Sequence, residues 1–188
     1  MQLPPDFIPS SKQPMQQVLW IGCSDSCFQE TTILDLLPDE MLVHRNLGNM
    51  LIEGDMSSEL TVKHAITCLK VNISKPLFKM IILTNQQVKH IVVCGHYGCG
   101  IVKAESRDGL NGPWLSKLDA LHSQFKGTID TLPSDERNQA FVELNVLDQL
   151  RSLRQFPEVS KAASEGNLQL HGIVYNLKSG KAQRLIEN

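Results

Sequence analysis

VKHIVVCGHYGCG, at residues 88–100, is the stretch that decides the fold. Its first seven residues are rich in β-branched and apolar types, which is typical of a buried strand in a parallel sheet. The glycine-rich turn at 95–100 ends this strand. An apolar run at 18–21 ends in a comparable turn, GCSDSC, at 22–27. The two strands predict a sheet in which both turns face one crevice.

The rest of the chain alternates between strand-like and helical patterns. Further strands are expected at 41–44 and 168–177. Helical patterns occupy 28–37, 57–70, 113–125 and 134–155. This alternation predicts an α/β fold, with one domain whose central, mostly parallel sheet is flanked by helices. We expect an N-terminal arm at 1–16, a domain at 17–188, and Ser57 as the N-cap of the second helix.

The composition excludes several classes of protein. Hydrophobic residues make up 41% of the 188, as is ordinary for a globular chain. Eighteen basic and twenty acidic residues give a net charge of −2, so no nucleic-acid partner is expected. No apolar run approaches the roughly 20 residues that cross a bilayer, and a secretory signal pattern is missing. We therefore expect a cytoplasmic protein with no membrane partner, whose five cysteines bind metal or fill the core.

Side chains that bind zinc lie in both glycine-rich turns. His96 and Cys99 form an H-x-x-C pair, and Cys23 and Asp25 form a C-x-D turn. Ligand sites form at the carboxyl ends of strands in open parallel sheets. Cysteine and histidine are common zinc ligands, and three of them leave the open position that a catalytic site needs. Asp25 is the candidate for a fourth ligand, which would close the site.

In five places the sequence resembles the β-class carbonic anhydrases. The matching segments run in a consistent order between about residues 16 and 184. They are IGCSDS (21–26), RNLGN (45–49), VCGHYGCG (93–100), ELNV (143–146) and HGIVY (171–175).

The resemblance implies a zinc enzyme that reversibly hydrates carbon dioxide to bicarbonate and a proton. One zinc ion per chain would be held by Cys23, His96 and Cys99, and Asp25 would act beside it. The backbone N–H of Gly100 and the side chain of Gln13 would contact substrate. The resemblance also implies a homodimer. Because two thiolates offset the charge of the metal, we expect better activity at alkaline pH.

Position 27 departs from the family pattern C-S-D-S-R, because Cys27 stands where the family has an arginine. In the family that arginine pairs with the aspartate and holds it away from the metal, and a neutral cysteine cannot replace it. We expect Asp25 to swing onto zinc, giving low activity that improves in Cys27→Arg. Cys27 itself either fills the gap left by the arginine or serves as an accessory metal ligand.

Residues 71–87, VNISKPLFKMIILTNQQ, form an insertion relative to the family. Removing them joins CLK to VKHIVVCGHYGCG, a family-like connection. Two interpretations are open, a translated unspliced intron and a genuine surface loop.

Two other functions fit the same motifs. Relatives of this fold hydrolyse carbonyl sulfide or carbon disulfide at the same zinc. Alternatively, the chain is a catalytically closed zinc-binding homologue that acts as a regulatory or binding subunit. The missing arginine favours this second alternative.

Overall fold

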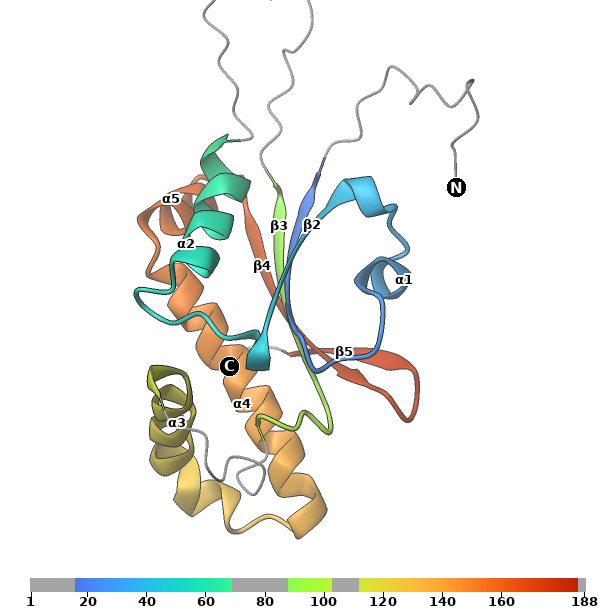
Figure 1. Ribbon diagram of the computed structural model, residues 1–188, viewed down its shortest axis with the longest axis vertical. Coiled ribbons are helices and arrows are strands. Elements are labelled where there is room, and N and C mark those ends of the chain that lie inside the picture. The colour runs from blue at the N-terminus through green and yellow to red at the C-terminus, as the bar shows by residue number, and fades with distance from the viewer. Residues whose placement is uncertain (1–15, 69–87, 103–111, 186–188) are drawn as a thin grey trace, which may run out of the picture.

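The computed structural model describes residues 16–68, 88–102 and 112–185, and within them it forms a five-stranded sheet. The strand order is β2-β1-β3-β4-β5 (Figure 1). The strands are β1 (Val18–Cys23), β2 (Met41–Asn46), β3 (His90–His96), β4 (Gln169–Asn176) and β5 (Lys181–Leu185). The first four are parallel, and β5 runs antiparallel to β4. The predicted single α/β domain with a mostly parallel sheet is confirmed.

Helices cover the two faces of the sheet unequally (Figure 1). One face carries α2 (Met56–Lys63), α3 (Pro113–Ile129), α4 (Ser134–Arg154) and α5 (Pro157–Ser164), and the other carries the short α1 (Glu30–Leu34). Short helical turns lie at Pro38–Glu40 and Leu47–Asn49, and α2 continues as a π-helix at His64–Cys68. Within the described ranges, no helix is both long and apolar enough to span a bilayer.

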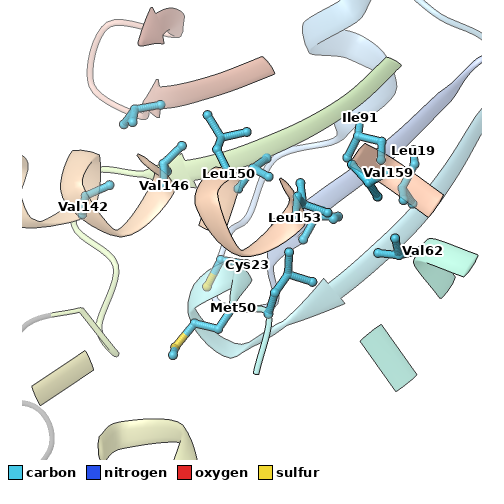
Figure 2. Packing of buried hydrophobic residues seen from close by; sticks show 14 of the residues in the cluster. Leu19, Cys23, Met50, Val62, Ile91, Val142, Val146, Leu150, Leu153 and Val159 are labelled. Carbon is cyan, nitrogen blue, oxygen red and sulfur yellow. The ribbon is translucent and has the colours of Figure 1, made fainter. Parts of the chain in front are cut away.

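The larger hydrophobic core lies between the sheet and α4. Alternate strand residues such as Leu19 and Ile91 point to this side, because successive side chains of a strand face opposite ways. Figure 2 shows them with Leu150 and Leu153 of α4. Burying such a side chain fully stabilises the fold by about 1.5–3 kcal/mol. The intervening residues, including Trp20, form a smaller cluster on the α1 side.

Glycines let α4 approach the sheet closely. A Cβ atom on Gly95 of β3 would lie 2.7 Å from Cγ2 of Val146. One on Gly172 of β4 would lie 2.9 Å from Cδ1 of Leu150. Since real Cβ atoms are not found so close to another side chain, these two glycines set the separation between α4 and the strands β3 and β4.

The start of α2 differs from the sequence-based expectation. Ser57 is not the N-cap; that residue is Asp55, whose carboxylate accepts hydrogen bonds from the backbone N–H groups of Ser57 and Ser58. A carboxylate at this position also interacts favourably with the positive end of the helix dipole. The prediction overlooked that an aspartate two residues earlier offers both effects.

Two elements were not predicted. The helix α5 has only eight residues, and its signals are the first-turn Pro157 and the buried Val159 and Ala162. The edge strand β5 is mostly exposed and has no apolar run to mark it. The predicted N-terminal arm up to residue 15, with Gln13, and the insertion at 71–87 lie outside the described residues.

Candidate metal centre

Cys23, His96 and Cys99 come together at the carboxyl ends of two neighbouring strands. Cys23 is the last residue of β1, His96 is the last residue of β3, and Cys99 lies in the turn that follows. Because β1 and β3 are parallel neighbours, their ends meet at the same edge of the sheet. The three candidate ligand atoms lie within 4.8 Å of one another, and all three residues are buried. In the described part of the chain, this is the only such group of three or more metal-binding side chains.

The three side chains fit a metal ion chemically. Both ring nitrogens of His96 are buried and lack a hydrogen-bond partner among the described residues. Buried polar nitrogens in native proteins nearly always have a partner, and a metal ion supplies one. The Sγ atoms of Cys23 and Cys99 lie 3.6 Å apart, close enough to share one ion. Two thiolates and one imidazole form a donor set that suits zinc.

The two thiols differ in acidity because they form one hydrogen-bonded pair. The Cys99 thiol donates to Cys23, and this bond lowers the pKa of Cys23 to about 4 against the opposing effect of burial. The same bond, together with burial, raises the pKa of Cys99. The metal-free pair therefore carries one negative charge, which is held mainly on Cys23.

Backbone amides stabilise that charge. The N–H of Gly48 donates to Cys23 Sγ over 3.2 Å, and the N–H of Asp25 donates over 3.4 Å. Gly48 belongs to the helical turn after β2, the RNLGN segment, and its φ of +77° lies in the left-handed region that suits glycine. The segment therefore contributes a hydrogen-bond donor to the candidate ligand.

Asp25 lies outside the three-residue group in this structure. Its side chain is exposed, and its carboxylate accepts a hydrogen bond from the Gly100 backbone N–H at 2.7 Å. The Gly100 N–H, which the resemblance assigns to substrate, is thus engaged by Asp25. Cys27 is also exposed and forms no disulfide with another cysteine that the structure describes.

Arg45 holds the turn after β1, a role that the sequence analysis missed. Its guanidinium donates to the carbonyl oxygens of Ser26 and Phe28 and to the carboxylate of Glu30 at 2.6 Å. Burial is the largest single effect and favours the neutral form of Glu30, but the bond from Arg45, a backbone hydrogen bond and the charge of Arg45 together outweigh it and lower the pKa of that carboxyl. Arg45 is the first residue of the RNLGN segment, so the family motif pointed to it. Nothing in the sequence indicated that Glu30 would be its partner.

Tyr97 ties the second turn to α4. Its hydroxyl donates to the Glu143 carboxylate at 2.5 Å. Burial, followed by this bond, raises the pKa of Tyr97 to about 12, so the phenol stays protonated at neutral pH. The turn that holds His96 and Cys99 is thereby anchored to the helix packed over it.

Comparisons with known proteins point to one family. The family described as carbonic anhydrase matches residues 18–73 and 83–182. A carbonic anhydrase of Emericella nidulans is 35% identical over 169 residues, which are 87% of this chain and 67% of that protein. The fold is similar to the β-carbonic anhydrase CafD of Aspergillus fumigatus (41% identity, TM-score 0.76, 98% of this chain and 97% of that one). It is also similar to a tetrameric β-carbonic anhydrase of Sordaria macrospora (30% identity, TM-score 0.76, 91% of this chain and 81% of that one).

Proposed function

The chain belongs to the β class of the carbonic anhydrase family, and from this premise we propose that Cys23, His96 and Cys99 hold one zinc ion for carbon dioxide hydration. Its relatives make it a carbonate dehydratase, a lyase that converts carbon dioxide and water into bicarbonate and a proton. The observation that carries the zinc proposal is the pair of partnerless nitrogens on buried His96 beside two thiols.

Zinc, when bound, lowers the pKa of a water molecule and so supplies the nucleophile for carbon dioxide near neutral pH. The residues of the chain set how strongly it does so. Cys23 and Cys99 would place two negative charges on the metal, which weakens its effect on water relative to three neutral histidines. We therefore expect the rate to rise between pH 7 and pH 9.

Asp25 would decide whether the site is open. We propose that it moves from the Gly100 N–H onto zinc as a fourth ligand, which leaves activity low. Its exposed carboxylate supports this proposal, and so does the cysteine at position 27, where the family has an arginine. Arg45 cannot act as the missing partner, because Glu30 and the carbonyls of the β1 turn already occupy its guanidinium.

A second candidate function follows from the missing arginine partner of Asp25. If Asp25 closes zinc permanently, the protein is a catalytically silent homologue that acts as a regulatory or binding subunit. The lost arginine at position 27 favours this alternative. It differs from a slow enzyme in one measurable respect, because no rate above the buffer background is then expected at any pH.

Assembly and location are also proposals. We propose a homodimer. The Sordaria macrospora relative is named as a tetramer, which supports self-association in general, and light scattering of the purified chain distinguishes two chains from four. We place the protein in the cytoplasm, because Cys23, Cys27, Cys94 and Cys99 are free thiols, as expected in a reducing compartment.

Zinc analysis and stopped-flow carbon dioxide hydration test the function on the same samples. We expect about one zinc per chain and a rate above background that increases with pH. Cys99→Ala should lose both zinc and activity. Cys94→Ala is the matched control, since Cys94 is also buried but lies outside the candidate centre, and it should keep both. Zinc well below one per chain in the wild type would contradict the proposal.

A further inference from the structure

Side chains of two helices form hydrogen bonds with the backbone of residues 47–51, which includes the second half of the RNLGN segment. We call this set of bonds the clamp. From α4, Asn145 Nδ2 donates to the Gly48 carbonyl at 2.9 Å, and Gln149 Oε1 accepts from the Leu51 N–H at 2.8 Å. From α3, Trp114 Nε1 donates to the Leu47 carbonyl at 2.6 Å. Every one of these bonds ends on backbone between residues 47 and 51, so they fix the path of the chain.

The two α4 side chains also support each other. Asn145 and Gln149 are 1% and 0% exposed, four residues apart on the apolar face of the helix. Gln149 Nε2 donates to Asn145 Oδ1 at 2.9 Å, and Lys117 Nζ of α3 donates to Gln149 Oε1 at 3.3 Å. Burying amides in a core is costly unless they are hydrogen-bonded. Here the oxygen and the nitrogen of each side-chain amide both have a hydrogen-bond partner, so each amide group has a single orientation.

The clamp acts on the peptide groups nearest Cys23. The peptide group between Leu47 and Gly48 presents its N–H to Cys23 Sγ at 3.2 Å, and Trp114 holds the carbonyl oxygen of that same group. Asn145 holds the oxygen of the next peptide group. The direction of the Gly48 N–H is thus set by side chains whose hydrogen bonds in the described structure end on backbone and on each other, not on the three candidate ligands.

We propose that Asn145 and Trp114, with Gln149 behind Asn145, are positioning residues that aim the Gly48 amide at the Cys23 thiolate and so tune metal binding. The inference rests on the proposed zinc site. Groups that hydrogen-bond to metal ligands orient them and adjust their donor strength, and losing one typically costs about 10–100-fold in metal affinity or activity.

Zinc affinity and the spectrum of the cobalt-substituted protein test this role. Zinc dissociation constants are measured by competition with a chromophoric chelator, and the thiolate-to-Co²⁺ charge-transfer band is recorded in the near ultraviolet. Asn145→Leu should weaken zinc binding about 10–100-fold. It should also move the band to longer wavelength, because a thiolate that loses a hydrogen bond is a stronger electron donor. Trp114→Phe, which removes one partly exposed bond, should change both in the same direction by less.

Leu153→Ala is the matched control. Leu153 lies on the same helix and is fully buried in the same hydrophobic core (Figure 2), but its aliphatic side chain forms no hydrogen bond to the backbone of residues 47–51. It should lower the melting temperature while zinc affinity and the cobalt band stay at the wild-type values. The inference is overturned if Trp114→Phe and Asn145→Leu keep both wild-type values, or if Leu153→Ala shifts both equally. A wild type that binds no zinc would instead overturn the proposed function.

Discussion

The Asp25 carboxylate accepts a hydrogen bond from the Gly100 backbone N–H at 2.7 Å, which joins the two glycine-rich turns across 75 residues of sequence. This bond keeps the only acidic side chain of the first turn away from the Cys23, His96 and Cys99 group. It is a single bond on an exposed side chain, so a divalent cation would compete with it for the carboxylate.

Cys27→Arg should raise carbon dioxide hydration by about tenfold or more. A new guanidinium beside Asp25 would add a charge-assisted hydrogen bond, and such bonds contribute about 1.5–3 kcal/mol. Each 1.4 kcal/mol is a factor of ten in the ratio of open to closed sites. The measurement is stopped-flow hydration at pH 7.5 on protein with verified zinc content.

Cys27→Ser is the control for that experiment, since it removes the thiol without adding charge and should leave the rate unchanged. Background rates in wild type and Cys27→Arg alike would favour the regulatory homologue over the enzyme. An equal gain in Cys27→Ser would show that the thiol itself, and not the missing charge, limits the rate.

Sequence reasoning found the three-residue group because its signals are local. Cys23 and His96 end apolar strands, Cys99 follows in the turn after the second of them, and the topology of parallel sheets brings such ends together. The clamp on the RNLGN segment could not be found in this way. Asn145 and Gln149 look like ordinary polar positions of a helix until packing shows that α4 buries them.

Zinc binding at pH 6, below the range in which a zinc-bound water loses its proton, should release about one proton per ion. The pKa of Cys23 is lowered well below that of a free thiol, chiefly by the bond from Cys99, so Cys23 is already a thiolate. The pKa of Cys99 is raised, so its proton must leave when the metal binds. Calorimetric titration of the apoprotein in buffers of different ionisation enthalpy measures the number. A value near two would contradict the single negative charge assigned to the pair.

Glu30→Gln should destabilise the fold by about 1–2 kcal/mol at pH 7, because the Arg45 guanidinium loses its charged acceptor at 2.6 Å. The pKa of Glu30 is lowered in the folded state, so its contribution is complete above the unfolded value of about 4.3. It disappears as the pH falls through the folded pKa. Urea unfolding of both proteins at pH 7 and in acid measures this difference.

Lys63→Gln is the comparison for that experiment. Lys63 forms an exposed pair with Glu59 at 3.8 Å, and such pairs contribute roughly 0.5 kcal/mol or less. Its effect should be small at both pH values. If Glu30→Gln behaved like Lys63→Gln, or if its effect persisted in strong acid, the ion pair with Arg45 would not be what stabilises the turn.

Gly95→Ala and Gly127→Ala should change stability in opposite directions. The new methyl group at Gly95 would lie 2.7 Å from Val146 Cγ2 and 3.1 Å from Val142 Cγ1, and overpacking of this kind costs about 1–3 kcal/mol. At Gly127, an exposed position of α3, a Cβ atom would meet nothing within 4 Å. Alanine there should stabilise the helix by about 0.4–1 kcal/mol. Urea unfolding measures both.

A double variant tests whether overpacking against α4 is what destabilises Gly95→Ala. If α4 packs too closely for a methyl group, Val146→Ala should restore the space, and the double variant should be more stable than the sum of the two single changes indicates. Because Gly95 precedes His96, the single variant should also weaken zinc binding, and the double variant should recover part of it. Additive effects on stability, with zinc affinity unchanged throughout, would show that the spacing between α4 and β3 does not position the metal centre.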